Sequence, residues 1–402
     1  MKILHTSDWH LGHRLHEQSQ HEEQFRFLNW LETYIHDHQV DVLLVSGDIF
    51  DTNVPSAQSQ KLYYDFLISL KKTSCQQIII TGGNHDAPGT INAPRELLNA
   101  LSIKVVGKAT DLIKDEVFEI NINNEKIIVA AVPYLRDQDI RRAIVAESFE
   151  QISDRYKTAL INHYTQVSDY CKTISNENTT IIAMGHLFAI GSMTSESEQT
   201  IYVGNLGDIG ANDFPDTFDY VALGHLHRAQ KIGGNDHIRY SGSPYLLSFS
   251  ELNNDKKIIG IKIENGKIDF VKEIAVPKFR EIRNIQGTFD ECIAQLHALD
   301  REHHELTPWV EVVLNNTESA SFGSTEIFKA SEHLKLEVLK VSNKNDRTIA
   351  GLEKLIENTQ HIKDLSPMEV FKLKCKERDF DLKANPEILD AFAEVLQIAL
   401  DR

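Results

Sequence analysis

The residues that decide the fold are the strand-like run at positions 2–6, KILHT, and the polar group Ser7-Asp8-Trp9-His10 directly after it. A short apolar run that is closed by polar residues predicts a buried strand followed by a loop. The same arrangement recurs at residues 41–46 (DVLLVS), 77–81 (QIIIT), 180–184 (TIIAM) and 220–223 (YVAL). The sequence therefore predicts five strands that each end at a polar loop.

Helices are predicted between these strands, at residues 24–38 and 56–70. In the first helix, Phe25, Leu28, Leu31 and Ile35 follow one another at intervals of three or four residues, which is helical spacing. Strands that alternate with helices predict a layered α/β fold with helices over a sheet. Residues 238–271 predict antiparallel hairpins, with turns at 241–244 (SGSP) and 264–267 (ENGK).

The composition is that of an ordinary soluble protein. The 402 residues, 41% hydrophobic and 25% charged, can bury a sizeable core in two or three structural units. There is no run of about 18 consecutive apolar residues and no apolar signal region at the start, so we expect a cytoplasmic protein. Cys75, Cys171, Cys292 and Cys375 lie far apart without a CxxC pair, which favours reduced thiols over a disulfide framework or a zinc knuckle.

The net charge bears on the kind of substrate. The chain has 42 Lys and Arg residues against 59 Asp and Glu residues, a formal net charge of −17. The surface as a whole therefore repels a polyanion. A nucleic-acid enzyme of this composition would need local basic patches, metal ions or a basic partner to hold its substrate.

Similar polar clusters follow all five predicted strands. In chain order they are Asp8-Trp9-His10, Gly47-Asp48-Ile49-Phe50-Asp51, Gly83-Asn84-His85-Asp86, Gly185-His186 and Gly224-His225-Leu226-His227. Five strand ends in one sheet can converge on one edge, which is where α/β folds place their ligands. Carboxylate, imidazole and amide oxygen together suit manganese, iron or zinc, and the lack of cysteine disfavours a structural zinc site. The clusters thus predict a metal site.

Each cluster alone has an ordinary structural explanation. Asp48 and Asp51 could cap the helix near Ser56, and Gly-Asn-His-Asp could be a β-turn. The Gly-His-x-His cluster is more specific, because alternate residues of an extended segment point the same way and two imidazoles can reach adjacent ions. The joint occurrence of all five clusters in this order, each at a strand end, is what indicates the metal site.

The five motifs in this order resemble those of the calcineurin-like metallophosphoesterase superfamily. The residues around them resemble, more narrowly, the family of nuclease subunits of bacterial SbcC–SbcD complexes: HTSDWHLG at 5–12, GDIFDT at 47–52, ALGHLHRAQ at 222–230 and YSGSP at 240–244. The resemblance runs from residue 1 to about residue 280 and is looser in the tail. It implies a metallophosphoesterase sandwich, β-sheets flanked by helices, with a small α/β capping domain and C-terminal helices.

The resemblance also implies a role for each motif residue. Asp8, His10, Asp48 and His227 would hold one ion, and Asp48, Asn84, His186 and His225 would hold the other, so that Asp48 bridges the two. His85 would lie near the scissile phosphate as a proton donor or transition-state stabiliser, and Asp51 would orient His85. Three further histidines near the first helix, His13, His16 and His21, are interpreted as solvated or helix-face residues.

The implied ligand set fits phosphodiester chemistry. Two divalent ions bring four positive charges, and only Asp8 and Asp48 among the direct ligands are anionic. The remaining positive charge favours a phosphodiester that gains negative charge in its transition state. The ions would also lower the pKa of a bound water molecule. The mixed nitrogen and oxygen donors favour two manganese ions as the cofactor.

Further units are predicted after residue 277. Residues 309–314 (WVEVVL) and 334–341 (LKLEVLKV) predict strands and 289–299 a helix, which gives a small α/β unit of two strands and one or two helices. Ser366-Pro367 and Asn385-Pro386 predict the starts of two closing helices. We expect a nuclease domain at 1–277, a capping domain that positions DNA at 278–345, and a linker with helices at 346–402. The alternative for the capping domain is that it only shields the core. The alternative for the closing helices is that they pack on the capping domain.

The resemblance implies a two-metal DNA nuclease of recombination and repair, with double-strand 3′–5′ exonuclease and single-strand or hairpin endonuclease activity. Its partners would be DNA and an SbcC-type ATPase with coiled coils, on which the C-terminal helices dock, and the chain would form a homodimer within a heterotetramer at the nucleoid. The sequence has no Gly-x-x-x-x-Gly-Lys-Ser/Thr loop, so ATP binding would belong to the partner. A phosphodiesterase or phosphatase with a small or protein substrate is the alternative. A non-catalytic scaffold is disfavoured because every ligand is present.

Overall fold

The computed structural model describes residues 1–136, 139, 149–189, 192, 209–315 and 320–343. Two compact units are distinguished. The first contains Met1–Asn284, His297–Glu311 and His333–Lys340, and the second contains Ile285–Leu296, Val312–Glu332 and Val341–Arg402, of which 344–402 lie outside the described residues. This division passes through a three-stranded sheet, so the domain boundaries expected at 277 and 345 stay predictions.

The first unit contains two six-stranded sheets. The first sheet has the strand order β14-β13-β1-β4-β5-β6. Its parallel strands are β1 (Lys2–Thr6), β4 (Val42–Ser46), β5 (Gln77–Thr81) and β6 (Ile103–Val106), and the hairpin of β13 (Lys257–Glu264) and β14 (Lys267–Ala275) adds two antiparallel strands next to β1.

The second sheet has the strand order β11-β12-β10-β9-β8-β7. Its parallel strands are β8 (Glu125–Ala131), β9 (Thr179–His186), β10 (Tyr220–Gly224) and β12 (Asn235–Tyr240), flanked by antiparallel β7 (Val117–Ile122) and β11 (Gln230–Ile232).

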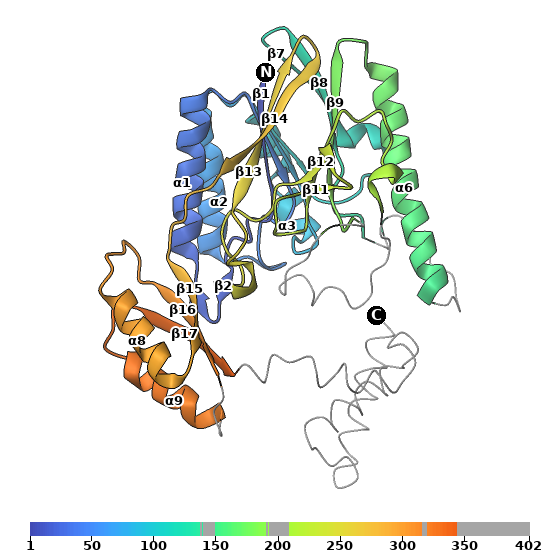
Figure 1. Cartoon of the computed structure of the whole chain (residues 1–402). Helices are drawn as coiled ribbons and strands as arrows, with labels where there is room; N and C mark the ends of the chain where they lie inside the picture. Colours follow the sequence, from blue (N-terminus) through green and yellow to red (C-terminus); the bar gives the residue numbers. More distant parts are fainter. Residues whose placement is uncertain (137–138, 140–148, 190–191, 193–208, 316–319, 344–402) are drawn as a thin grey trace. The chain divides into compact units, whose positions relative to one another are not determined.

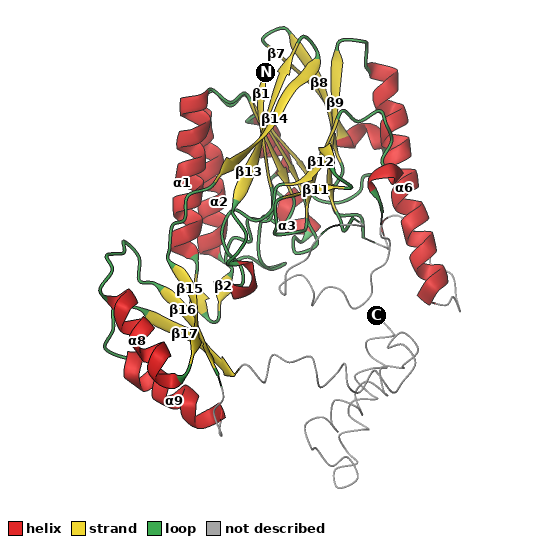
Figure 2. Ribbon diagram, viewed as in Figure 1, coloured by secondary structure: helices red, strands yellow, loops and turns green. Residues whose placement is uncertain are grey.

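Alternation along each strand explains the layers. In β4, Val42 and Leu44 face the second sheet in a shared core, whereas Leu43 and Val45 pack under α1 (His21–His38) and α2 (Ala57–Ser69). The second sheet is covered on its outer face by α6 (Phe149–Ile174). The strands β1, β4, β5, β9 and β10 are thus buried on both faces, which is why they are nearly continuous apolar runs, whereas the edge strand β14 contains no buried residue. Figures 1 and 2 show the strands of this unit between α1 and α2 on one side and α6 on the other.

The remaining elements among the described residues of this unit are short. They are β2 (Arg14–Leu15), β3 (Gln18–Ser19), α3 (Pro88–Asn92), α4 (Arg95–Ala100) and the 3₁₀ helices η1 (Leu70–Lys72), η2 (Ile113–Glu116), η3 (Ala211–Asp213) and η4 (Phe249–Glu251). The N-cap of α2 is Ser56, whose side chain accepts a hydrogen bond from the amide of Ser59. Ser56 therefore caps this helix, and neither Asp48 nor Asp51 is needed as its cap.

The C-terminal part of the described chain forms a three-stranded sheet with two helices. The strand order is β15 (Ile282–Gly287), β16 (Trp309–Leu314) and β17 (Glu337–Asn343), and the helices are α8 (Phe289–Asp300) and α9 (Ala320–Ser331). The small α/β unit is present, but it has three strands where two were predicted. The predicted helices at Ser366 and Asn385 lie outside the described residues.

Three detailed predictions were wrong. The five motif strands are divided between two sheets and do not share one. Phe25 is exposed, and the buried stripe of α1 uses Phe27 with Leu28, Leu31 and Ile35. Residues 241–244 do not join two hairpin strands, because β12 pairs with β11 before them and lies parallel to β10.

Two further sequence observations concern the whole described chain. Cys75, Cys171 and Cys292 are free and buried, and Cys375 lies outside the described residues. Within those residues, no helix has the length and apolar character needed to cross a membrane.

Candidate metal centre

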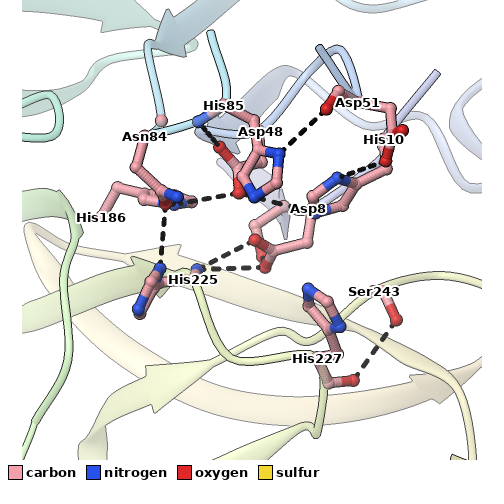
Figure 3. Close-up of polar contacts among 12 residues, drawn as sticks. Asp8, His10, Asp48, Asp51, Asn84, His85, His186, His225, His227 and Ser243 are labelled. Carbon is pink, nitrogen blue, oxygen red and sulfur yellow. Dashed lines mark hydrogen bonds and ion pairs between the residues drawn. The ribbon is translucent and has the colours of Figure 1, made fainter. Parts of the chain in front are cut away.

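The motif loops of the two sheets meet at one place. β1, β4 and β5 of the first sheet end in the loops that carry Asp8, Asp48 and Asn84, and β9 and β10 of the second end at His186 and next to His225. Figure 3 shows these side chains directed toward one another. The contact between the sheets is direct, since His186 Nδ1 lies 2.9 Å from the carbonyl oxygen of Ser46 at the end of β4.

The loops hold an uncommon backbone conformation. Asp8, His10, Asp48 and His225 have φ of 52°, 42°, 50° and 104°, which is the left-handed region that side chains other than glycine rarely adopt. Such residues cost on the order of 1–3 kcal/mol each and persist where their surroundings hold them. Here the amide of Asp8 donates to Gly47 at 3.0 Å and that of His10 donates to Asp48 at 3.0 Å. The strain therefore falls on the residues whose side chains converge.

Glycine allows the loops to approach each other closely. A Cβ on Gly83 would lie 2.1 Å from Oδ1 of Asp48, and one on Gly224 would lie 1.9 Å from the carbonyl oxygen of Ser46. Neither position has room for any side chain. The glycines next to the polar clusters are thus required by the distance between the loops.

Asp48 lies at the centre of the cluster. Its side chain is buried, and Oδ2 lies 3.3 Å from Nε2 of His186 and 3.5 Å from Nε2 of His10. Oδ1 accepts a hydrogen bond of 2.9 Å from the amide of His85. One carboxylate therefore contacts groups from both sheets.

Asn84 joins the two histidines of the second sheet. Its Oδ1 lies 2.9 Å from Nε2 of His186 and 3.0 Å from Nδ1 of His225. The amide of His225 in turn donates to Oδ1 of Asp8 at 2.9 Å. Asn84, His186 and His225 are thus within the range at which one ion could contact all three.

The donor atoms fit divalent cations. The potential ligand atoms lie within 4.8 Å of one another in the sets Asp8–His10–His227, Asp8–Asp48–His186 and His10–Asp51–His85. Both ring nitrogens of His10 are buried without a hydrogen-bond partner among the described residues. The nearest groups are carboxylate oxygens of Asp48 and Asp51 at 3.5 and 3.3 Å, so the ring has acidic neighbours but makes no hydrogen bond to them. A metal ion would satisfy a buried imidazole of this kind.

The electrostatics of the protein alone reflect the crowding of buried charge. Burial raises the pKa of Asp8. Burial opposes ionisation of Asp48 too, but the neighbouring His186 outweighs it and holds the pKa of Asp48 well below its usual value. Burial would lower the pKa of His186, but the neighbouring Asp48 outweighs burial and raises this pKa to about 9. Burial, together with the neighbouring His186, lowers the pKa of His225 to about 3. Divalent cations would offset the two carboxylates without requiring a protonated histidine.

His85 and Asp51 are in contact, but through the main chain. Nδ1 of His85 lies 2.9 Å from the carbonyl oxygen of Asp51. The Asp51 carboxylate lies instead 2.8 Å from Nδ1 of His13 and 3.3 Å from Nδ1 of His10. Nε2 of His13 also contacts the carbonyl oxygen of Leu247 at 3.0 Å.

The interpretation of His13 as a solvated or helix-face residue was therefore wrong. His13 precedes α1 and is half-buried between Asp51 and Leu247. Its neighbour His16 is exposed, as expected, and His21 is the half-buried first residue of α1. The three histidines are close in sequence, and only the tertiary contacts distinguish them.

Two other buried acidic residues support the site and were given no role from the sequence. The Asp86 carboxylate accepts the amides of Gly83, Ile49 and Phe50 at 2.9–3.1 Å, which ties the β4 loop to the β5 loop. Burial, together with Asp48, raises the pKa of Asp86 to about 6. The second residue, Glu251, lies 3.2 Å from Nδ1 of His227. Asp86 belongs to the cluster Gly83-Asn84-His85-Asp86, whereas no sequence signal marks Glu251.

Known families match both parts of the chain. Residues 1–229 match the calcineurin-like phosphoesterase family, and residues 278–379 match the type 5 capsule protein repressor C-terminal domain. The SbcD subunit of the nuclease SbcCD of Escherichia coli strain K12 is 31% identical over 399 residues, 98% of each chain. The corresponding subunit of Bacillus subtilis strain 168 is 28% identical over 324 residues, 80% of this chain and 81% of that protein.

A two-sheet sandwich with Asp, Asn and His donors at its strand ends defines a metal-dependent phosphoesterase. The chain belongs to the calcineurin-like phosphoesterase family. The likeness to the Escherichia coli protein extends over almost the whole length of both chains. The present chain is therefore a member of the SbcD group within that family. Its cofactors are divalent metal ions.

Proposed function

We propose that this chain is a two-metal DNA nuclease that hydrolyses phosphodiester bonds as the nuclease subunit of a complex with an SbcC-type ATPase. The observation that carries the proposal is the position of Asp48, whose Oδ2 lies between the imidazoles of His186 and His10 at 3.3 and 3.5 Å. A carboxylate in this position can bridge two cations. The relatives are named as subunits of the nuclease SbcCD, which supports DNA as the substrate.

The proposed ligands form two sets that share Asp48. One set is Asp8, His10, Asp48 and His227, and the other is Asp48, Asn84, His186 and His225. We infer manganese as the metal, because the donors mix imidazole nitrogen with carboxylate and amide oxygen. When bound, two divalent ions would supply an activated water molecule and offset the charge of the phosphorane-like transition state.

His85 is proposed to act on the substrate. A carbonyl oxygen can only accept, so the contact with Asp51 places a proton on Nδ1 of His85 and fixes the ring. Nε2 is then the nitrogen available for chemistry. In the protonated ring it can donate to the leaving oxygen or to a phosphate oxygen, a contribution typically worth about 10²–10⁴ in rate.

Partner and domain roles follow from the same proposal. With a net charge of −17, the free chain should bind DNA weakly and with strong salt dependence, so the ATPase is proposed to supply the basic surface. Residues 278–345 would position DNA, and 346–402 would dock on the ATPase. The assembly would contain a homodimer of this chain in a heterotetramer and act at the nucleoid, in the cytoplasm.

The alternative, a phosphodiesterase or phosphatase for a small or protein substrate, shares the metal site. The test uses end-labelled duplex, hairpin and single-stranded DNA with Mn²⁺, each with the chain alone and with its ATPase. We expect 3′–5′ degradation of duplex ends and cutting of single strands or hairpins. Asp48→Asn provides the inactive control. Turnover of bis(p-nitrophenyl) phosphate without cleavage of any DNA would favour the alternative.

A further inference from the structure

We propose that Glu251, held by Lys256, is a positioning residue for the metal ligand His227. The inference rests on the proposed metal site and concerns how the chain prepares one of its ligands. Glu251 would fix both the tautomer and the orientation of the imidazole, so that its other nitrogen faces the cation.

Glu251 is the last residue of η4, and its side chain is fully buried. Oε1 lies 3.2 Å from Nδ1 of His227. Oε2 lies 2.6 Å from Nζ of Lys256 and accepts the amide of Leu247 at 3.2 Å. Both oxygens of the carboxylate are therefore engaged, one with the imidazole and the other with a cation and an amide.

Lys256 holds His227 at a second point. Its Nζ also contacts the carbonyl oxygen of His227 at 3.3 Å and Oγ of Ser243 at 2.7 Å. The same carbonyl accepts the amide of Ser243 at 3.1 Å, and Figure 3 shows Ser243 beside the main chain of His227. One Glu–Lys pair, in which Glu251 is fully buried and the Lys256 side chain is 10% exposed, thus restrains His227 at two points. Glu251 holds the ring, and Lys256 holds the backbone.

The cost of this arrangement argues for a functional reason. Removing a carboxylate and an ammonium from water is unfavourable, and well-packed apolar residues often replace a buried pair without loss of stability. A carboxylate that receives Nδ1–H leaves the lone pair on Nε2, and a metal ion binds that neutral form. The pair therefore prepares His227 for coordination, which apolar residues could not do.

The chain contains a matched control for this test. Glu116 is also fully buried, and its Oε2 lies 2.8 Å from Nε2 of His163. Neither Glu116 nor His163 belongs to the proposed ligand sets. Glu116→Gln thus repeats the chemical change of Glu251→Gln at a buried Glu–His contact without a proposed metal ligand.

The experiment measures Mn²⁺ binding to the full chain by titration calorimetry and thermal unfolding in EDTA. We expect Glu251→Gln to weaken one of the two Mn²⁺ sites by about 10–100-fold. Glu116→Gln should lower the unfolding temperature in EDTA and leave both Mn²⁺ affinities unchanged. Wild-type affinities in Glu251→Gln, or an equal loss in Glu116→Gln, would overturn the proposal.

A double-mutant cycle tests whether Glu251 acts through His227. If it does, His227→Ala with Glu251→Gln should bind Mn²⁺ no more weakly than His227→Ala alone. Additive losses of affinity would refute the assignment. If Glu251→Gln does not fold, the double variant Glu251→Gln with Lys256→Met replaces it, because it removes both charges. This double variant is expected to show the same selective loss of Mn²⁺ affinity at one site. Wild-type affinity in the double variant would count against the proposal.

These readouts separate the inference from the proposed function. If the wild-type chain bound no Mn²⁺, both the metal site and this inference would fail. If it bound two Mn²⁺ ions but cleaved no DNA, the substrate proposal would fail, while the affinities of the Glu251 variants would still support or overturn the positioning role.

Discussion

The main-chain amide of His85 donates a 2.9 Å hydrogen bond to Oδ1 of Asp48. The residue proposed for proton transfer is thus tied to the proposed bridging carboxylate by its backbone. Its imidazole is held separately, by the carbonyl oxygen of Asp51. The side chain of His85 can therefore be removed while the contact that orients Asp48 remains.

His85→Ala is accordingly expected to bind both Mn²⁺ ions with wild-type affinity and to lose about 10²–10⁴ in kcat. Titration calorimetry gives the stoichiometry, and cleavage of labelled duplex DNA gives the rate. Normal cleavage by this variant would remove His85 from the chemistry. Loss of Mn²⁺ binding would instead make it a ligand.

Asp48→Asn should abolish binding at both metal sites, because the two proposed ligand sets share this carboxylate. Each of the two sites is expected to add about 2.7 kcal/mol to the stability of the wild-type protein at a Mn²⁺ concentration 100 times its Kd, and the variant should gain almost none. Unfolding temperatures with EDTA and with Mn²⁺ measure this difference. The exposed Asp65→Asn is the control. A variant that still binds one ion tightly would argue against a bridging role.

Metal binding should strengthen as the pH rises from 6.5 toward 9. Burial lowers the pKa of His186, but Asp48 outweighs it and raises the pKa to about 9 in the metal-free chain. A raised histidine pKa stabilises the folded metal-free protein below pH 6.5, and this contribution is lost as the pH passes through about 9. Because a ligand histidine binds metal in its neutral form, Mn²⁺ must displace this proton.

The apparent Kd for Mn²⁺ is therefore expected to fall by up to about tenfold per pH unit in that window, with release of up to about one proton. Calorimetry in two buffers of different ionisation enthalpy counts the protons. A Kd that does not change between pH 6.5 and 8, without proton release, would contradict the prediction.

Gly83→Ala should disrupt the metal site, because its Cβ would lie 2.1 Å from Oδ1 and 2.3 Å from the amide nitrogen of Asp48. We expect loss of Mn²⁺ binding and a lower unfolding temperature. Gly89→Ala is the matched control, since a Cβ there meets nothing within 4 Å. Equal Mn²⁺ affinities in the two variants would show that the β4 and β5 loops can separate without consequence.

A chain that ends at residue 345 should lose co-purification with the ATPase, because residues 346–402 are proposed to dock on it. Mn²⁺ binding should persist, since every proposed ligand lies at or before His227. Pull-down with the ATPase and titration with Mn²⁺ measure the two effects. Retained co-purification would place the docking surface elsewhere in the chain.

The sequence by itself determined the strands and the chemistry of the loops. β1 and β5 begin and end where the apolar runs predict, and β4, β9 and β10 differ from prediction by one or two residues. Strands of this kind are visible because both faces are buried and the apolar run is continuous. The donor residues follow those runs directly, so the kind of site could be predicted as well.

Only the tertiary structure decided how the strands are divided and what supports the ligands. β1 pairs with β4 and also with β13, where Leu4 lies opposite Gly260, and such a pairing leaves no local signal. The same holds for Glu251, an acidic residue in a polar segment, until folding brings it 3.2 Å from His227. Ligand types are local information, whereas the contacts that orient them depend on residues brought together by packing.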